Sequence, residues 1–592
     1  MTWQQIISSL FPWLEGATVR LEALGAKLPR LPRRWVLPLS ALVLLAIACL
    51  MRCLHLFYAG YYYIMSPDSY FFDWVSRGVL ASSPPAARPG AEAVYTLHSG
   101  LVYPLAYLAK GARAVFGLAP ADALALVDKF LPPVIGVVTM FLIYLFAAKI
   151  CNRRVAMFSA LAWAVMLLSV FIGSAGYLDR DGLSLLLLTV GAFLFYLSGI
   201  WQIKVRGIDL GWLIGGVGVL VTEGLLYIEW SFAGPVLLLA VVASYCVGRF
   251  LFEYYELAET KPDMRQRLAA SIIKVNWRAF ALIVVANAFV AGWNFHLVGS
   301  WYHTAITIVQ GGVTSTISEE RGLGVGDLIG YQLFLIPMVV GLYLAFKKRA
   351  ESSIFFCCWF IILFILAIFA RRILTYAAPA ASLLSGVGLA FLWDWVKQGQ
   401  LRMLKWIGMT ALGVLAVLFS FLLAYSLPAQ FAVSPDRGWQ DALMYLREET
   451  PTDSAVMSQW TWGYWILDQG QRRPVVDNGY YGYNAESLRD VGLAYYTTDP
   501  AEVAQLMRKY GAEYLVFSEL DLKTAPTIMG WANVGQGLAN FPGDSLVVRS
   551  LNGEFESGGG LKVVYRSPPE PNSTSPSEPE VVILGLTQSG AP

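Results

Sequence analysis

Long apolar runs, separated by mostly short polar loops and by two long ones, fill residues 36–427. Eleven of the runs approach the ~20 residues that an α-helix needs to cross the hydrocarbon core of a bilayer. They are 36–53, 131–149, 155–173, 183–200, 211–228, 232–249, 279–296, 328–346, 354–370, 374–394 and 405–426. The pattern predicts a polytopic α-helical membrane domain over 36–427, which follows a cytoplasmic amphipathic leader at 1–35.

From residue 428 onward the pattern is that of a water-soluble domain. Helical periodicity at 439–448 and 502–510 alternates with short strand-like runs, which predicts an α/β domain over 428–566. The predicted strands are 455–457, 474–477, 514–517, 546–548 and 562–565. Residues 567–592 begin with a segment rich in Pro, Ser and Glu, and we expect a flexible tail there. Asn572 lies in a glycosylation acceptor pattern, and both a modified asparagine and a chance match are open.

The composition agrees with a membrane protein. Of the 592 residues, 57% are hydrophobic and only 14% are charged, whereas a soluble domain has roughly 25% charged residues. Membrane lipid is therefore the expected surrounding of most of the chain. The formal net charge of +2 provides no field that would attract nucleic acid. All six cysteines lie in or beside apolar runs, which does not fit a disulfide framework.

Lysine and arginine gather in alternate loops, and this predicts the side that each loop faces. The clusters are at 149–154, 204–206, 261–278, 347–349 and 397–405. Because cytoplasmic loops carry such an excess, the loops 54–130 and 297–327 and everything after 427 should face outward. We therefore expect a multi-pass protein of the inner (plasma) membrane with a periplasmic C-terminal domain.

Four carboxylates lie on this outer side. Asp68 and Glu319 are in the two long loops, and Asp179 and Asp181 are in a short loop before the span at 183–200. Carboxylates beside a bilayer are costly unless they face a wet cavity or an ion. Hard oxygen ligands without histidine or thiolate favour Mg²⁺ or Mn²⁺. For each acid alone, capping a helix is an equally good interpretation.

An arginine pair and a glycine-rich loop add to the chemistry of the outer side. Arg371 and Arg372 interrupt an apolar run where positive charge is least expected. A guanidinium at this place would bind phosphate oxygens or would extend to lipid headgroups. The loop 297–327 is long enough to close over a substrate as a lid.

An aromatic cluster follows the strand predicted at 455–457. Its sequence is Ser458-Gln459-Trp460-Thr461-Trp462-Gly463-Tyr464-Trp465. Aromatic side chains with polar atoms can form a rigid pocket for a peptide or a sugar. The competing interpretation is an ordinary buried aromatic core.

In their order along the chain, these segments resemble the catalytic subunit of oligosaccharyltransferase, in particular its bacterial single-subunit form. The order is an aspartate followed by aromatic residues (68–72), Gly-Tyr-x-Asp-x-Asp (176–181), Thr-Ile-x-Glu (316–319), Arg-x-x-x-Tyr-x-x-Pro (372–379) and the tryptophan-rich segment. Each motif is weak alone, but five in sequence cover most of the chain. The resemblance implies a GT-C type membrane glycosyltransferase of about 11 to 13 spans, with additional membrane segments expected in 97–116.

The resemblance also implies a reaction. A glycan would pass from a polyprenyl pyrophosphate carrier to asparagine in Asn-x-Ser/Thr of an acceptor polypeptide, with inversion and without accessory chains. The residues that would hold the Mn²⁺ or Mg²⁺ ion are Asp68, Asp179, Asp181 and Glu319. Asp68 and Glu319, with Asp181 assisting nearby, would be catalytic and the first two would hydrogen-bond the acceptor amide. Arg372 and Tyr376 would bind the pyrophosphate.

The expected acceptor pocket departs from the family pattern. The family has Trp-Trp-Asp-Tyr-Gly, whereas this chain has Gln459-Trp460-Thr461-Trp462-Gly463. Thr461 therefore replaces the aspartate that accepts a hydrogen bond from the acceptor hydroxyl. A threonine hydroxyl both donates and accepts, so a pocket of Gln459, Trp460, Thr461 and Trp462 is still expected, with the preference between serine and threonine open. A helical element at 521–523 or 528–529 would line it.

Two other function classes share part of this pattern. A second kind of GT-C enzyme would use a polyprenyl phosphate sugar to modify a lipid or a Ser/Thr hydroxyl, without need of the tryptophan-rich pocket or Arg372. A membrane transporter would place acids within its spans, and Glu223 in the fifth span is the feature that favours this class.

Overall fold

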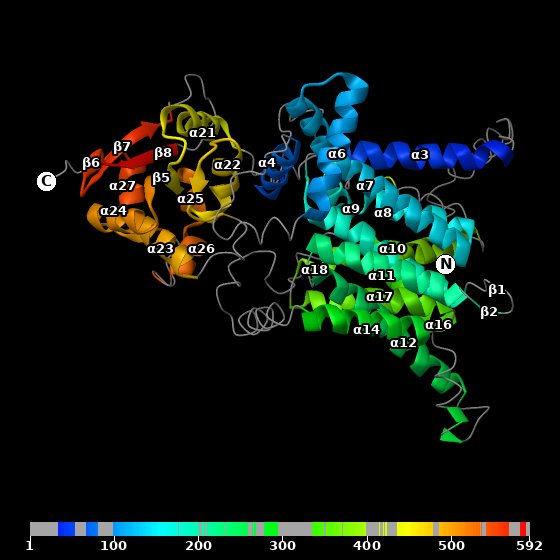
Figure 1. Ribbon diagram of the computed structural model, residues 1–592. Coiled ribbons are helices and arrows are strands. Elements are labelled where there is room, and N and C mark those ends of the chain that lie inside the picture. Colours follow the sequence, from blue (N-terminus) through cyan, green and yellow to red (C-terminus); the bar gives the residue numbers. More distant parts are fainter. Residues whose placement is uncertain are drawn as a thin grey trace, which may run out of the picture.

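A bundle of long helices and a C-terminal α/β domain make up the structure, which is a computed structural model (Figure 1). The residues that it describes are 33–53, 67–80, 99–175, 177–200, 204–205, 208–209, 211–230, 233–257, 263–264, 266–267, 277–293, 334–348, 351–369, 371–397, 414, 418, 421–422, 435–477, 485–532, 534, 540–567 and 581–587. Nearly all of the predicted leader at 1–35 and the whole loop 297–327 lie outside these residues, as does most of the span predicted at 405–426.

The described helices of the bundle lie before residue 398, and Phe421 also packs against its core. Its helices are α3 (Arg33–Cys53), α4 (Pro67–Leu80), α6 (Ser99–Phe116), α7 (Pro120–Ile150), α8 (Arg153–Val165), α9 (Leu167–Ile172), α10 (Arg180–Ile200), α11 (Gly211–Trp230), α12 (Ala233–Glu256), α14 (Trp277–Trp293), α16 (Leu335–Lys348), α17 (Glu351–Ala367), α18 (Ile373–Tyr376) and α19 (Ala378–Lys397). The short strands β1 (Lys204–Val205) and β2 (Ile208–Asp209) pair at the end of the bundle that is remote from the C-terminal domain (Figure 1).

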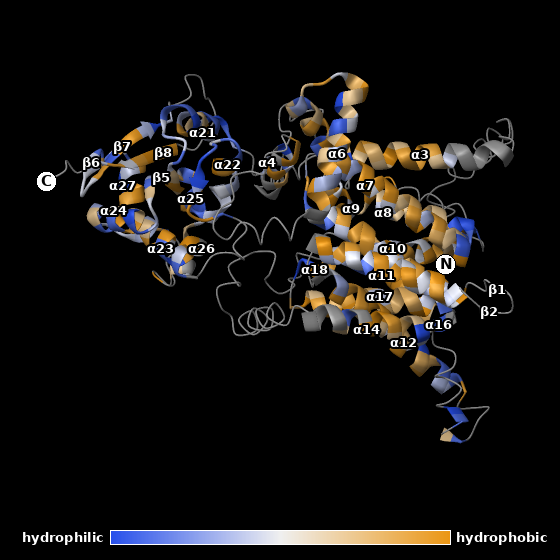
Figure 2. Cartoon of the chain, in the orientation of Figure 1, coloured by the Kyte–Doolittle hydropathy of each residue, from blue (hydrophilic) through white to orange (hydrophobic). Residues whose placement is uncertain are grey.

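Five helices of the described part are long and apolar enough to cross a membrane. They are Pro120–Ile150, Asp181–Ile200, Gly211–Ile228, Gly234–Glu256 and Ala378–Lys397, and shorter apolar helices lie at Ser40–Cys53, Leu335–Lys347 and Glu351–Ala367. Apolar residues dominate the bundle along its whole length (Figure 2). The chain is thus a multi-pass membrane protein, and α6, in the run 97–116, is not among these candidate spans.

One predicted span is interrupted. The single helix expected over 155–173 is wrong, because Met166 is extended (φ −65°, ψ 125°) and separates α8 from α9. The guanidinium of Arg52 fills the space beside the break and donates hydrogen bonds to the carbonyl oxygens of Ala164 and Ser169, each at 3.3 Å. Apolar side chains continue across the break, so the hydropathy pattern carries no sign of it.

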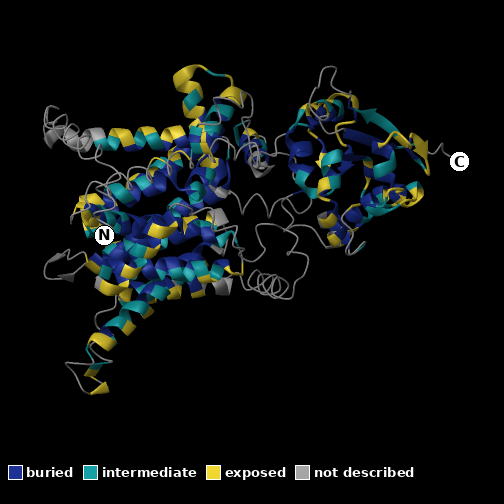
Figure 3. Ribbon diagram, turned by 180° about the vertical axis from the view of Figure 1, so that it is seen from behind, coloured by how far each residue is buried: buried dark blue, intermediate teal, exposed yellow. Residues whose placement is uncertain are grey.

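Close packing fixes the interior of the bundle, which is almost wholly buried (Figure 3). Phe146 of α7 stacks on Phe193 of α10 with ring centroids 3.7 Å apart. Glycines let two helices touch through their backbones: a methyl group on Gly388 of α19 would overlap the carbonyl oxygen of Pro337, and one on Gly341 of α16 would overlap that of Leu384. The crossing of α16 and α19 therefore depends on the absence of these side chains.

The C-terminal domain is built on a six-stranded sheet with the order β4-β3-β5-β8-β7-β6. The strands are β3 (Ala455–Met457), β4 (Arg473–Pro474), β5 (Ala512–Ser518), β6 (Ser557–Gly558), β7 (Leu561–Arg566) and β8 (Val581–Leu586). β4, β3 and β5 run parallel, and β8, β7 and β6 extend the sheet in antiparallel fashion. The helices are α21 (Arg437–Glu449), the 3₁₀ helix η5 (Trp460–Trp462), α22 (Gly463–Asp468), α23 (Ala485–Tyr496), α24 (Pro500–Lys509), α25 (Glu519–Lys523), α26 (Ala525–Ala532) and α27 (Leu546–Leu551).

Alternate strand residues point into two cores, one on each face of this sheet. Val456 and Ile583 face α21 and α22, whereas Met457 and Leu584 face α23, α24, α26 and α27. The result is a three-layer α/β/α domain. The first core continues into residues of α4, α6 and α7, so the C-terminal domain packs directly against the bundle.

Two expectations for this domain are wrong. Residues 546–548, predicted as a strand, begin helix α27, where the Ser545 hydroxyl accepts from the Val548 N–H and caps the helix. The flexible tail predicted over 567–592 contains β8, which pairs with both β5 and β7 in the middle of the sheet. The domain therefore continues beyond 566. A short apolar run after a Pro/Ser linker becomes a strand only through partners distant in sequence, and no local pattern records them.

Candidate functional site

Asp179 and Asp181 lie at the start of helix α10. Asp181 is in its first turn, where the partial positive charge of the helix N-terminus stabilises a carboxylate. Both residues are buried, at 8% exposure. The segment before them is held to α3, because the Ala175 N–H donates to the Arg52 carbonyl oxygen at 2.9 Å. Local structure thus places two acids at one end of the bundle.

Arg372 and Tyr376 meet these acids from the other half of the bundle, across 191 and 195 residues of sequence. The Nε and Nη2 atoms of Arg372 donate to the two carboxylate oxygens of Asp181, at 2.9 Å each for the shorter contacts. The Nη2 atom also lies 3.7 Å from Oδ2 of Asp179. The Tyr376 hydroxyl donates to Oδ1 of Asp181 at 2.8 Å. Four of the predicted site residues therefore form one cluster.

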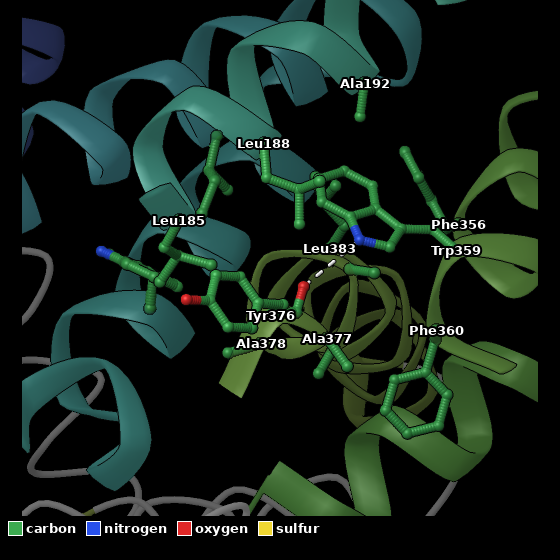
Figure 4. Close-up of a cluster of buried hydrophobic side chains, with 14 of the residues drawn as sticks. Leu185, Leu188, Ala192, Phe356, Trp359, Phe360, Tyr376, Ala377, Ala378 and Leu383 are labelled. Carbon is green, nitrogen blue, oxygen red and sulfur yellow. Dashed lines mark hydrogen bonds between the residues drawn. The ribbon is translucent and has the colours of Figure 1, made fainter. Parts of the chain in front are cut away.

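The apolar core holds Tyr376 in place. Its ring is buried among Leu185, Leu188 and Leu383 (Figure 4). Its carbonyl oxygen accepts a hydrogen bond of 3.3 Å from the indole Nε1 of Trp359. Because α18 is only one turn long, these contacts rather than helix propensity fix the direction of the hydroxyl.

The net charge of this cluster would favour the binding of a cation. Two carboxylates face one guanidinium, so the cluster has an excess negative charge when all three groups are ionised. The backbone of Asp68 lies in α4, but its side chain and the whole of Glu319 lie outside the described residues. Within the described part of the chain, no group of three acids, histidines or cysteines is close enough to hold a metal ion. Of the four predicted ligands, Asp179 and Asp181 are the two whose side chains are described, and their carboxylates are oxygen ligands of the type that Mg²⁺ and Mn²⁺ prefer.

The tryptophan-rich segment follows strand β3 and forms η5 and α22. Trp462 is buried against Trp439 and Trp465, with ring centroids 5.1 Å and 4.7 Å away. Trp460 and Thr461 are partly exposed. The segment is thus a core cluster on one side and a surface on the other, which combines the two interpretations of the sequence.

Three hydrogen bonds order the polar groups of this segment. The Thr461 hydroxyl donates to Oε1 of Gln459 at 3.1 Å. The Gln459 N–H donates to the Tyr495 hydroxyl at 3.0 Å, and that hydroxyl donates to the Val516 carbonyl oxygen. Gln459 and Thr461 are therefore held to each other and to strand β5.

Asp521 also contacts the tryptophan-rich segment, and the sequence indicated it only as part of one of two candidate elements that would line the pocket. It follows β5 in α25, is fully buried, and accepts a 2.7 Å hydrogen bond from Nε1 of Trp462. It also accepts from the Ser518 N–H. Burial raises the pKa of Asp521 to about 7, although these hydrogen bonds act to lower it. The carboxyl ends of the parallel neighbours β3 and β5 meet at one edge of the sheet, which brings Asp521 to Trp462.

Glu223, the residue that favoured a transporter, lies in α11 and is buried. Its Oε1 accepts a 2.7 Å hydrogen bond from the Asn287 amide of α14. Such a pair joins two helices in the membrane. This contact accounts for the acid without a transport pathway.

The known proteins to which this chain is similar in sequence have the same kind of activity in their names. No family model matches the chain. Dolichyl-phosphooligosaccharide-protein glycotransferase 1 of Pyrococcus furiosus is 26% identical over 525 residues, which are 76% of this chain and 53% of that protein. The protein of the same name from Archaeoglobus fulgidus is 22% identical over 69% of this chain and 75% of its own length. The chain thus spans about half the length of the first of these relatives.

Solved structures show the same fold. The archaeal oligosaccharyltransferase of Archaeoglobus fulgidus, in complex with an inhibitory peptide and a dolichol-phosphate, superposes with a TM-score of 0.69 at 14% identity, over 90% of this chain and 79% of that one. The oligosaccharyltransferase of that organism in complex with Zn and sulfate superposes with a TM-score of 0.64 at 15% identity, over 90% and 79% of the two chains.

Proposed function

Since the chain is similar to archaeal dolichyl-phosphooligosaccharide-protein glycotransferases over most of its length and shares the GT-C fold of membrane glycosyltransferases, we propose that it is an oligosaccharyltransferase that transfers a glycan from a polyprenyl pyrophosphate carrier to asparagine in Asn-x-Ser/Thr. The observation that carries the proposal is the meeting of Arg372 and Tyr376 with Asp179 and Asp181. α18, which ends in Tyr376, lies at the end of the bundle nearer the C-terminal domain (Figure 1). A donor anchored in the membrane and a water-soluble acceptor would meet at this end.

Arg372 would bind the pyrophosphate of the donor. Its guanidinium keeps its positive charge at any physiological pH and matches the oxygens of a phosphate in geometry. Asp181 fixes the plane of this guanidinium through two nitrogen atoms, and Tyr376 fixes Asp181. The arginine is thereby oriented before the substrate arrives, which lowers the entropic cost of binding.

Asp68 and Glu319 would activate the acceptor amide. An amide nitrogen is a poor nucleophile because its lone pair is delocalised over the carbonyl group. Two carboxylates that accept its two N–H groups favour rotation about the C–N bond, which localises the lone pair. The nitrogen then attacks the anomeric carbon, the C–O bond to pyrophosphate breaks with inversion, and one amide proton passes to a carboxylate.

Asp68, Asp179, Asp181 and Glu319 would hold a Mn²⁺ or Mg²⁺ ion. When bound, such an ion supplies positive charge that stabilises the departing pyrophosphate. The contact of Asp181 with Arg372 keeps the metal-binding carboxylates close to the guanidinium that would bind the same pyrophosphate. The oligosaccharyltransferase of Archaeoglobus fulgidus, which has the same fold, has been solved in complex with Zn and sulfate.

Gln459, Trp460, Thr461 and Trp462 would bind the Ser/Thr of the acceptor. The Thr461 hydroxyl uses its proton on Gln459, so its oxygen accepts a hydrogen bond from the acceptor hydroxyl. Asp521 holds Trp462 rigidly behind this surface. The missing family aspartate is in this way replaced by a neutral acceptor.

The membrane placement follows from the same picture. The protein would lie in the inner (plasma) membrane with the C-terminal domain on the periplasmic side, and would act as a single subunit. β1 and β2, which come from a lysine- and arginine-containing loop, lie at the bundle end remote from that domain (Figure 1). This arrangement fits the excess of positive charge in cytoplasmic loops.

The test is transfer by the purified chain. The protein is incubated with lipid-pyrophosphate oligosaccharide, Mn²⁺ and a labelled Asn-x-Thr peptide, and the product is analysed by mass spectrometry. We expect a glycan on the asparagine, no product with a chelator, and a loss of about 100-fold or more in Asp68→Ala and Glu319→Ala. Asp453→Ala, which removes an exposed acid of the C-terminal domain, is the matched control and should keep full activity.

Two outcomes would overturn this function. Transfer to a lipid or to a serine hydroxyl with an untouched asparagine would place the chain among the other GT-C enzymes. Full activity of both alanine variants would remove the catalytic assignment of these two acids.

A further inference from the structure

Helix α4 lies between the bundle and the C-terminal domain (Figure 1). Tyr70 of α4 packs edge-on against Trp465 of α22, with ring centroids 6.3 Å apart and planes at 72°. Both residues belong to the apolar core that runs from α6 and α7 to the sheet. The two halves of the molecule are therefore joined by a buried interface rather than by a linker alone.

One arginine bridges this interface. In the last turn of α4, Arg77 donates through Nε to Asp73 of the same helix at 2.9 Å, and its Nη2 atom also contacts this carboxylate. The same Nη2 atom donates to Oδ1 of Asp468 at 2.7 Å, across 391 residues of sequence. The carboxylates are buried while the guanidinium is partly exposed.

Arg77 supplies positive charge to a group of buried acids. Asp128 of α7, only 1% exposed, interacts with Asp73, Asp468 and Arg77. Three buried acids therefore surround one guanidinium. Burial, followed by repulsion from Asp73, raises the pKa of Asp468 to about 8, whereas Arg77 acts to lower it. Removal of the arginine would leave three buried carboxyl groups without the positive charge that offsets their burial.

The bridge also joins two segments to which we assign different parts of the substrate. Along α4, Arg77 lies about 14 Å from the position of Asp68, which would bind the acceptor asparagine. Asp468 ends α22, which begins directly after Trp462 of the segment that would bind the Ser/Thr. An acceptor peptide must contact both segments at once. Their separation is fixed only if α4 and α22 do not move relative to each other.

We propose that Arg77, paired with Asp468, is a positioning residue that sets the spacing between the asparagine site and the Ser/Thr site. This inference rests on the proposed function. Without the bridge, the competent spacing is populated less, and the apparent affinity for the peptide falls by that fraction. Donor affinity should be affected much less, because Arg372 and Tyr376, which would bind the pyrophosphate, lie outside the two helices that the bridge joins.

The experiment separates the two substrates. KM for an Asn-x-Thr peptide, KM for the lipid-linked donor and kcat are measured for Arg77→Met, Asp468→Asn, their combination and Arg77→Lys. We expect the peptide KM of Arg77→Met to rise about tenfold with a donor KM within about twofold of wild type. The combined variant should be no worse than Arg77→Met, since both changes break one interaction. Arg77→Lys should recover part of the loss.

Controls keep the result interpretable. Arg154→Met breaks an exposed ion pair with Asp394 that joins α8 and α19, and should leave both KM values unchanged. Thermal unfolding in detergent identifies any variant that does not fold, and Arg77→Lys and Asp468→Asn then carry the test.

Several results would contradict the inference. They are an unchanged peptide KM in Arg77→Met, equal rises in the peptide and donor KM values, and additive effects in the combined variant. A wild-type chain that glycosylates no peptide would instead contradict the proposed function.

Discussion

Asp521 shows how a single buried side chain affects both packing and pH response. Its carboxylate holds Trp462 from below the surface of the tryptophan-rich segment. Burial raises its pKa to about 7, compared with ~3.9 in an unfolded chain. The folded state thus binds the proton more tightly, so the stability that this group contributes is complete below pH ~4 and is lost as the pH rises through 7.

Asp521→Asn should remove this part of the pH dependence. Between pH 5 and 8, the free energy of unfolding of the wild type should fall more steeply than that of the variant, as measured by denaturant unfolding. Asp468, whose pKa is also raised, contributes in the same direction in both proteins and cancels in the comparison. Parallel pH curves would mean that Asp521 is ionised in the folded state.

The site residues illustrate what a sequence can predict. Their charge on the predicted outer side singles out Asp179, Asp181 and Arg372, the family resemblance adds Tyr376, and the structure brings all four together. The contact of Arg372 with Asp181 could not be derived from spacing, because it depends on how α10 and α18 pack. Asp521 was hard to identify because its partner Trp462 lies in η5, after the neighbouring strand β3, and not near it in sequence.

At the scale of elements, the crossing of α16 and α19 leaves no space for an added side chain. A methyl group on Gly388 meets the backbone oxygen of Pro337, and no rotamer change relieves such an overlap. We expect Gly388→Ala to lower the free energy of unfolding by about 1–3 kcal/mol, measured by thermal unfolding in detergent. Gly224→Ala of α11 is the matched control, since nothing in the described structure lies within 4 Å of the added methyl group.

The control should be neutral or slightly stabilising, by up to ~1 kcal/mol, because alanine favours a helix over glycine. If Gly388→Ala were as stable as Gly224→Ala, α16 and α19 would have to cross at a greater distance than observed.

Element boundaries mark the limit of the hydropathy pattern. Long apolar helices such as α7, α10 and α12 were predictable because their length and composition are decisive by themselves. The break at Met166 was not predictable, because a buried arginine from α3 determines it. Strand β8 was missed for a related reason, since five apolar residues have no periodicity that separates a strand from a tail.

For the whole molecule, β8 determines where the fold ends. Deletion of 568–592 removes a buried strand from between β5 and β7, and each of its Val, Ile and Leu side chains contributes about 1.5–3 kcal/mol when buried. We expect the C-terminal domain of this variant to be digested by a protease that leaves the wild type intact, and glycosylation to be lost. Deletion of 588–592, beyond the strand, should change neither property.

A protease-resistant C-terminal domain in the longer deletion would show that the sheet closes without β8. The same experiment also tests the continuous core, because α4 and the sheet share it. Loss of the domain should therefore expose Tyr70 and its neighbours and lower the thermal stability of the bundle.

The burial of Arg52 has a consequence for how the chain is made. Outside its own helix, its guanidinium donates hydrogen bonds to the carbonyl oxygens of Ala164 and Ser169, which follow 112 and 117 residues later. At ~5–20 residues per second, a ribosome needs on the order of 10 s to reach them. During that interval the newly inserted α3 must keep its arginine in water or among lipid phosphates at the bilayer surface. The helix α3 can therefore reach its final depth in the membrane only after residues 164–169 have been synthesised.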